Sequence, residues 1–306
     1  MRALTLALVA ASTAAPASYA QSRSATVAAV RTIADSIPGG TGGLELGPDG
    51  HLYTSDFGAT LSSGPAGTRV FRVTPAGEVS VFADGLVGAS GNTFAADGSF
   101  LQSNVAGNTI SRIAPDGTVR AFATEGLRNP VGIIAGSDGA YYIANCGGND
   151  VRRVTPDGAV TLFSADSLLR CPNGIALGPG GDLYVSNFYN GDVVRLDRSG
   201  RGSRLATLPG ANNGHLVFGN GVFYVVARKA NQIYEVAVNG TVRLLAASGA
   251  RGGVDGPASS ATFSLPNDLA LSVDGRTLYV NEVGANVPGD QVLTPTRIRA
   301  LTLPRR

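Results

Sequence analysis

The sequence predicts an all-β protein, a six-bladed β-propeller with four antiparallel strands in each blade. Three observations lead to this prediction. A strand–turn–strand pattern occurs six times, at spacings of 48, 41, 42, 40 and 54 residues. A second glycine-containing turn recurs in five of these repeats, at spacings of 40, 41, 42 and 40 residues. Glycine supplies 42 of the 306 residues, which suits a fold with many tight turns, and a period near 40 with two hairpins is typical of a propeller blade.

The first turn of each repeat joins the two strands nearest the predicted channel. Glycine follows the key turn residue in every repeat, and glycine accepts the positive φ that a tight hairpin requires. The key turn residues are Asp49, Asp97, Asp138, Gly180, Asn220 and Asp274.

The fourth repeat shows the four strands of a blade most clearly. We expect the inner strand at 174–177 and the next two strands at 182–187 and 192–197. The outer strand is expected at 203–207. The apolar runs in these segments fit strands that are covered on both faces by neighbouring blades.

The sixth repeat has no fourth strand after 296–303. The segment 26–37, which contains Thr-Val-Ala-Ala-Val-Arg-Thr-Ile, precedes the first repeat. We therefore expect it to complete the sixth blade, to close the ring and to leave no free sheet edge. A repeat solenoid and an open pair of β-sandwich sheets are the alternatives. The expected blades are about 41–88, 89–128, 129–170, 171–210, 211–264 and 265–304 plus 26–37, within a single domain over 21–306.

The first twenty residues read as a secretory signal peptide. Met1-Arg2 begins the chain, an apolar stretch covers 3–14, and Ser18-Tyr19-Ala20 forms a small-x-small cleavage pattern. A membrane anchor is the alternative, but the apolar run is shorter than the roughly 20 residues a span needs. We expect cleavage after about Ala20, a periplasmic or secreted protein, no membrane span and a monomer.

Composition excludes several classes of function. The formal net charge of +2 gives no basic surface for nucleic acid. The only lysine, Lys229, is not part of a P-loop, and the chain has no nucleophile elbow, zincin motif or dinucleotide fingerprint.

Polar residues cluster where the inner strands begin and the second strands end, at one face of the ring. We expect these residues to surround the mouth of the central channel and to bind a small molecule or a protein partner. The candidate ligand-binding residues are Asn173, Asn213, Asn267 and Asp268. In the alternative interpretation, the asparagines cap exposed backbone of the inner strands.

The ends of the second strands carry Asp56, Asn104, Asn145 and Asn187. A residue type that recurs at one blade position favours a structural role, the capping of a loop in each blade. Glu282 occupies the same position in the last repeat and stands out as a longer acid.

Two segments resemble known propeller families. The run Asp255-Gly-Pro-Ala-Ser-Ser-Ala-Thr-Phe-Ser-Leu-Pro-Asn-Asp-Leu-Ala270 resembles NHL repeats. Cys171-Pro-Asn-Gly-Ile-Ala176, together with 184–197, is similar to a blade of the gluconolactonase, regucalcin and strictosidine-synthase-like superfamily. The resemblance covers about 41–304 and specifies fold better than activity.

Lactonases of that superfamily use a divalent cation held by Glu, Asn and Asp at the strand starts. The resemblance thus implies Asn173, Asn267 and Glu282 as candidate ligands of Ca²⁺ or another divalent cation. Gly42-Gly43 stands where the family has its first metal-binding Glu, so the match is partial. No cofactor follows from the sequence by itself.

The chain has two histidines, His51 in a turn and His215 at the start of an inner strand. His215 and Glu282 are therefore the candidate catalytic residues. The first functional hypothesis is an exported binding propeller with a polar mouth. The alternative is a metal-dependent hydrolase of lactones or esters, in which the cation polarises a carbonyl and His215 or a carboxylate activates water.

Cys146 and Cys171 are the only cysteines. Cys146 follows the second strand of the third blade, and Cys171 precedes the inner strand of the fourth. Both positions lie on the mouth face of adjacent blades, and the export signal implies an oxidising compartment. We expect a disulfide between them; two buried thiols are the alternative.

Overall fold

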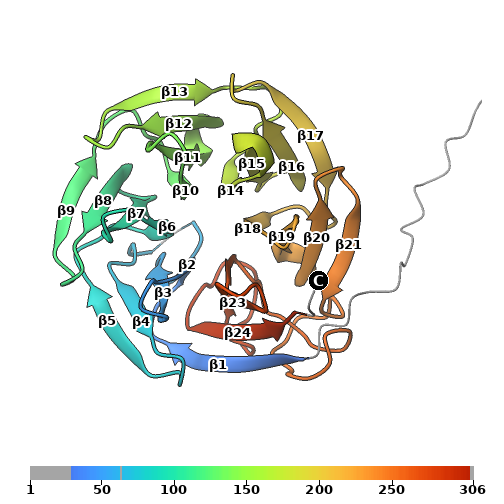
Figure 1. Ribbon diagram of the computed structural model, residues 1–306. Coiled ribbons are helices and arrows are strands. Elements are labelled where there is room, and N and C mark those ends of the chain that lie inside the picture. Colours follow the sequence, from blue (N-terminus) through green and yellow to red (C-terminus); the bar gives the residue numbers. More distant parts are fainter. Residues whose placement is uncertain (1–28, 63, 304–306) are drawn as a thin grey trace, which may run out of the picture.

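The computed structural model describes residues 29–62 and 64–303 and shows six four-stranded antiparallel sheets around a central channel (Figure 1). The predicted six-bladed propeller is therefore confirmed. The predicted signal peptide lies outside the described residues. No helix in the described residues is long and apolar enough to cross a membrane.

Each blade runs from an inner strand at the channel to an outer strand at the rim. Blade 1 consists of β2 (Thr41–Leu46), β3 (Leu52–Asp56), β4 (Val70–Val73) and β5 (Val79–Ala83). Blade 2 consists of β6 (Ala89–Phe94), β7 (Phe100–Asn104), β8 (Thr109–Ile113) and β9 (Val119–Ala123). Blade 3 consists of β10 (Pro130–Ala135), β11 (Tyr141–Asn145), β12 (Asp150–Val154) and β13 (Val160–Ser164).

The remaining three blades repeat this order, except that the last one takes a strand from the other end of the chain. Blade 4 consists of β14 (Pro172–Leu177), β15 (Leu183–Asn187), β16 (Asp192–Leu196) and β17 (Gly202–Thr207). Blade 5 consists of β18 (Asn213–Gly219), β19 (Val222–Ala227), β20 (Gln232–Ala237) and β21 (Val242–Ala246). Blade 6 consists of β22 (Asp268–Leu271), β23 (Thr277–Val283), β24 (Thr296–Thr302) and β1 (Val30–Ile37).

Strand β1 closes the ring, as the sequence predicts. It pairs antiparallel with β24, from Val30 opposite Leu301 to Ile37 opposite Thr296. Val30 and Ile37 are buried against the body of blade 6 and its neighbours. The closing strand thus supplies both hydrogen bonds and apolar packing.

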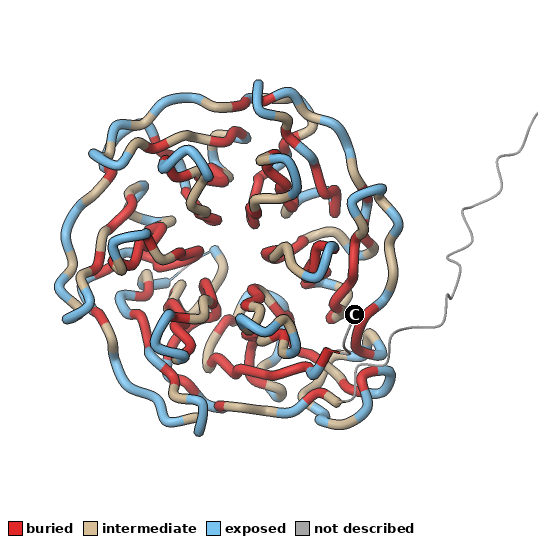
Figure 2. Tube along the Cα trace, viewed as in Figure 1, coloured by how far each residue is buried: buried red, intermediate tan, exposed pale blue. Residues whose placement is uncertain are grey.

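The core lies between neighbouring blades, where apolar side chains of facing sheets meet. Buried positions concentrate on the three inner strands of each blade, and the outer strands are largely exposed (Figure 2). One such layer between blades 1 and 2 contains Tyr53, Phe82, Phe94 and Phe100, whose ring centroids lie 4.9–6.0 Å apart. Because every blade packs on two neighbours, the strands carry apolar residues on both faces.

Glycines let the inner strands approach one another closely around the channel. A Cβ atom at Gly91 would lie 2.4 Å from the carbonyl oxygen of Val131, and one at Gly132 would lie 2.4 Å from that of Asn173. Gly214 stands equally close to the backbone of Asn267. The repeated glycines therefore allow backbone-to-backbone packing that a larger residue would prevent.

Candidate functional site

The mouth face is the side of the ring where the inner strands begin. There Thr41 pairs with Asp56, Pro172 with Asn187, and Asn213 with Ala227. The starts of the inner strands and the ends of the second strands thus lie side by side, as the sequence analysis expects.

A solvent-open pocket of about 380 Å³, which we call the mouth pocket, lies on this face. Its apolar lining residues are Leu61, Phe188 and Leu265, and its polar ones are Asn212, Arg228, Lys229, Asp290 and Gln291. Sequence reasoning proposed none of these residues for a binding site. Four blades contribute to this lining, so the pocket is a product of the closed ring.

Two long loops lie on this face, one described over 57–62 and 64–69 and the other over 284–295. They connect the second and third strands of blades 1 and 6, where blades 2 to 5 use four-residue connections. The loops pair with each other: Leu61 N–H donates to Gln291 O over 2.8 Å, and Leu293 N–H donates to Ala59 O over 2.9 Å. The loop after β3 reaches towards the central axis (Figure 1), and its Leu61 lines the same pocket as Phe188 of blade 4.

Three titratable side chains on the inner strands of different blades lie near one another: His215, Asp268 and Glu45. His215 Nδ1 lies 3.3 Å from Asp268 Oδ2. Asp268 also accepts the N–H groups of Leu44, at 2.9 Å, and Leu269, at 2.7 Å. Burial raises the pKa of Asp268 to about 8. Burial, with the nearby Asp268, raises the pKa of Glu45 to about 8 as well.

The His215 ring is buried and lies close to the inner strand of blade 2. Burial lowers its pKa to about 4, so the imidazole is neutral at pH 7. Its Cε1 would lie 3.0 Å from a Cβ at Gly91, in blade 2 across the ring. Nδ1 faces Asp268 Oδ2, and Nε2 is buried without a partner among the described residues.

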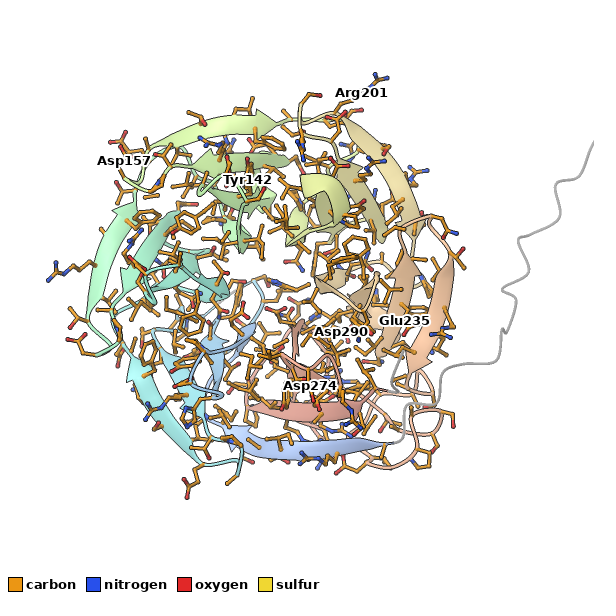
Figure 3. The ribbon with its side chains drawn as sticks, in the orientation of Figure 1. Tyr142, Asp157, Arg201, Glu235, Asp274 and Asp290 are labelled. Carbon is orange, nitrogen blue, oxygen red and sulfur yellow. A yellow bond between two sulfur atoms is a disulfide. The ribbon has the colours of Figure 1, made fainter. Side chains whose placement is uncertain are left out.

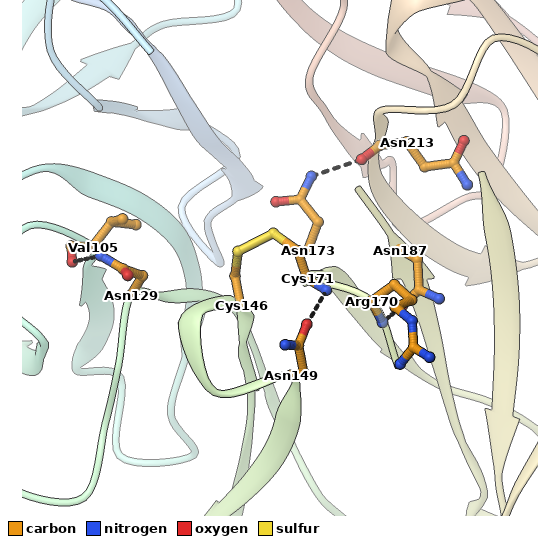
Figure 4. The surroundings of a disulfide bond; sticks show 9 residues. All are labelled: Val105, Asn129, Cys146, Asn149, Arg170, Cys171, Asn173, Asn187 and Asn213. Atoms are coloured by element: carbon orange, nitrogen blue, oxygen red, sulfur yellow. Dashed lines mark hydrogen bonds between the residues drawn. A yellow bond between two sulfur atoms is a disulfide. The ribbon is translucent and has the colours of Figure 1, made fainter. Parts of the chain in front are cut away.

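The predicted asparagines bind backbone of the neighbouring blade. Asn173 Nδ2 donates to Asn213 O over 2.8 Å (Figure 4), and Asn267 Nδ2 donates to Gly42 O over 2.8 Å. The Asn213 amide points instead towards Asp192 O of blade 4. The interpretation of Asn173 and Asn267 as caps of inner-strand backbone thus has direct geometric support.

Glu282 does not join His215 at the mouth. Its Oε1 accepts from Arg299 Nη1 over 2.7 Å, and its Oε2 accepts from Ser264 N–H over 2.7 Å. Both Glu282 and Arg299 are fully buried. The expectation that Glu282 shares a catalytic or cation site with His215 is corrected here, because both of its oxygens are engaged inside blade 6.

Glu282 instead follows the pattern of the other second-strand ends. Asn145 Oδ1 accepts from Arg128 N–H, Asn187 Oδ1 accepts from Arg170 N–H (Figure 4), and Asp56 Oδ1 accepts from Gly40 N–H. Each acceptor caps the loop that leads into the inner strand of its own blade. The predicted loop-capping role is therefore seen, and Glu282 performs it too.

The side chains suggested as cation ligands make contacts with other groups of the protein. Among residues 29–62 and 64–303, no group of three or more His, Cys, Asp or Glu side chains lies close enough to hold a metal ion. The Nδ2 groups of Asn173 and Asn267 donate to carbonyl oxygens, and Glu282 is bound to Arg299.

The disulfide prediction is confirmed. Cys146 and Cys171 are bonded, with Cα atoms 3.9 Å apart, and they join the end of β11 to the start of β14 (Figure 4). Asn149 Oδ1 accepts from Cys171 N–H over 2.7 Å beside the bridge. His51, the other histidine, lies in a turn and binds Asp49, away from the channel.

Comparison with known proteins places this architecture in context. Residues 33–235 match the model of the virginiamycin B lyase family. None of the curated proteins matches the chain. A streptogramin B lyase is 17% identical, with 92% of this chain and 99% of that one covered and a TM-score of 0.62.

Two further solved structures illustrate the same likeness. A gluconolactonase from Xanthomonas campestris is 18% identical, with 92% and 91% of the two chains covered and a TM-score of 0.69. A catalytically inactive histidine-to-alanine variant of virginiamycin B lyase from Staphylococcus aureus, with quinupristin, is 17% identical over 90% and 99% of the chains, with a TM-score of 0.61. At these identities the likeness shows the propeller fold.

Proposed function

Because the chain belongs to the virginiamycin B lyase family, we propose that it binds a small, partly apolar organic molecule in the mouth pocket. The observation that carries this proposal is the pocket itself, which four blades line and whose wall includes Leu61 and Gln291 of the two paired loops. Concave sites with an apolar lining and a few polar groups are the usual form of small-molecule sites. The Staphylococcus aureus relative with quinupristin supports a ligand of this general kind.

Binding is tested by calorimetry with quinupristin and a set of small lactones. Leu61→Ala shortens a side chain that lines the pocket, and Leu162→Ala makes the same change at an exposed position of β13. We expect affinity to fall several-fold in the first variant only. Equal affinities in both variants would show that the ligand binds elsewhere.

Cleavage of an ester C–O bond is a second candidate function. The observation that favours it is His215, whose Nδ1 lies 3.3 Å from Asp268 and whose Nε2 has no partner among the described residues. A neutral imidazole with a free nitrogen can accept a proton from water or from a carbon acid. His215 is only 6% exposed, so this chemistry requires a movement that gives the substrate access to the ring.

Mass spectrometry of a lactone reaction tests the second function. Hydrolysis adds one water to the substrate, whereas elimination leaves its mass unchanged. His215→Ala should abolish either reaction, and His51→Ala should leave it intact because His51 is bound to Asp49 in a turn. Turnover that survives His215→Ala would exclude this histidine as the base.

Export is the remaining part of the proposal. The Cys146–Cys171 bridge supports an oxidising compartment, where disulfides persist. Fractionation of a cell that expresses the full chain tests it, with recovery from the periplasm or medium as the expected result.

A further inference from the structure

Arg228 is a buried cation without a counter-ion. It begins the short 3-10 turn η3 (Arg228–Ala230) that follows β19, and it is 4% exposed. Its Nη2 is buried with no hydrogen-bond partner, and no described residue forms an ion pair with it. Burial lowers its pKa to about 10, which leaves the guanidinium charged at neutral pH.

Two other buried arginines in the protein have carboxylate partners. Arg299 is fully buried and binds both Asp255 and Glu282. Arg297 is nearly as deep and lies against Asp35 and Glu282. Burying an unpaired charge costs folding free energy, and a buried arginine therefore usually pairs with a carboxylate, as these two do.

Arg228 also differs from the residues at its own position in other blades. The residue that directly follows the second strand is Val105, Cys146 and Phe188 in blades 2, 3 and 4. These side chains are apolar or bridged, so the fold does not require a cation there. The charge at this position therefore points to a ligand.

The surroundings of Arg228 define what that ligand carries. Arg228 lines the mouth pocket beside Lys229 and Asn212, opposite the apolar Leu61, Phe188 and Leu265. Asp290 attracts Arg228 over a longer distance, and Arg251 repels it. Asp290 lies inside the ring of outer strands (Figure 3) but is itself about half exposed and bound to Arg251. The pocket thus offers one guanidinium, which can donate two parallel hydrogen bonds, and apolar side chains next to it.

We propose that Arg228 is the anion-binding subsite of the mouth pocket and that it takes the carboxylate of a monoanionic organic acid with an apolar body. The planar guanidinium matches a carboxylate through two parallel hydrogen bonds, and a partly desolvated site strengthens them. Asp290 disfavours a dianion such as a phosphate monoester. This subsite rests on the proposed function, and it suits that function chemically, because breaking an ester C–O bond by hydrolysis or by elimination releases a carboxylate.

The test is calorimetric binding of benzoate, hexanoate, neutral benzamide and inorganic phosphate to the intact protein. In Arg228→Gln we expect benzoate and hexanoate to bind about ten- to a hundred-fold more weakly, as for loss of a charged hydrogen bond. Benzamide affinity should not change. Arg228→Lys keeps the charge but loses the fork, so it should recover only part of the affinity. Arg120→Gln, at an exposed site on β9, is the matched control.

A stability measurement separates a ligand-binding role from a structural one. Removing an uncompensated buried charge should leave the ligand-free Arg228→Gln protein at least as stable as the parent. A large drop in its melting temperature would show that Arg228 holds the fold and would overturn the proposal. If neither benzoate nor hexanoate binds at concentrations up to about 10 mM, the binding free energy is weaker than about 3 kcal/mol. That result would overturn the proposal as well.

The remaining outcomes distinguish the subsite from the proposed function. Tighter binding of phosphate than of benzoate would overturn the carboxylate assignment. Lactone binding that depends on Leu61, together with benzoate binding that ignores Arg228, would remove the subsite and leave the proposed function standing. Arg228-dependent benzoate binding without any lactone binding would support the subsite and contradict the proposed lactone ligand.

Discussion

Arg299 is among the most deeply buried side chains of the protein, and two carboxylates hold it. Its Nη1 binds Glu282 over 2.7 Å, and its Nη2 binds Asp255 over 2.6 Å. Asp255 also accepts the N–H of Thr32 in the closing strand. A single guanidinium therefore ties the linker between blades 5 and 6 to the interior of blade 6.

Replacing Arg299 should destabilise the protein strongly. Arg299→Met leaves the fully buried Glu282 without its main partner, and loss of one member of a buried pair costs about 3–5 kcal/mol. The free energy of unfolding in urea measures this. Arg120→Met is the control, and the double variant with Glu282→Gln should recover part of the loss. A cost below about 1 kcal/mol, the range of surface pairs, would contradict this prediction.

The buried carboxyl groups of the channel predict an unusual dependence of stability on pH. Burial raises the pKa values of Asp268 and Glu45 to about 8, so the folded protein holds these protons where the unfolded chain has lost them. Their contribution to stability is full below about pH 4 and is lost as the pH rises towards 8. His215, whose pKa is lowered, has the opposite effect, but only up to about pH 6.5.

We therefore expect the free energy of unfolding to fall between about pH 6.5 and 8. Asp268→Asn should flatten this decline, while Glu45 still contributes part of it. Asp274→Asn, in an exposed turn, serves as the control because its pKa is lowered rather than raised. Urea midpoints across this range give the slope directly, and parallel slopes for the parent and Asp268→Asn would rule out the assignment.

The sequence predicts residue roles well where they repeat and poorly where they occur once. The loop caps at the second-strand ends repeat in most blades, so their structural role is visible by alignment. Glu282 misleads because its length suggests chemistry. The register of β23 and β24 places Arg297 opposite it and Arg299 opposite Val280, and only the side-chain contacts show that Arg299 binds it. Asp268, which the sequence analysis names at the mouth, also occupies the column filled by glycine in the other five repeats, a second signal that sets it apart.

At the scale of elements, the disulfide joins two strands that belong to different blades. It connects the end of β11 to the start of β14, with 25 positions between the cysteines. The topology is predictable because both strand ends lie on the mouth face. The mouth pocket could not be predicted in this way, because part of its wall comes from loops that differ between the repeats and that pair with each other.

Removing the bridge should lower stability by about 3.5 kcal/mol, the loop-entropy value for 25 residues. Cys146→Ser with Cys171→Ser, compared with the oxidised parent in urea, gives the measurement. Thiol titration of the unfolded, unreduced parent should find no free thiol. Two free thiols would show that the bridge does not form in solution.

At the scale of the whole molecule, the ring depends on a strand from its N-terminal end. Without β1, the strand β24 becomes an unprotected edge, and the buried faces of Val30 and Ile37 are lost. The sequence predicts this closure because the sixth repeat lacks its fourth strand, and an additional strand precedes the first repeat and can take that place.

Deleting residues 21–38 should lower the melting temperature sharply, because it removes all of β1. Deleting 21–28, which precede β1, should leave it nearly unchanged. Calorimetry on the two truncated chains gives the comparison. Equal melting temperatures would show that the sixth blade is stable with three strands.

The paired loops over the mouth have a consequence for the outer rim. Their contact between Leu61 and Gln291 spans the joint between blades 1 and 6, which is the same joint that β1 secures from outside. A molecule that binds in the mouth pocket contacts these loops and so stabilises the contact between blades 1 and 6. Its binding free energy is therefore linked thermodynamically to ring closure. Occupancy at the centre should therefore slow amide hydrogen exchange in β1, a strand that no ligand in the pocket touches.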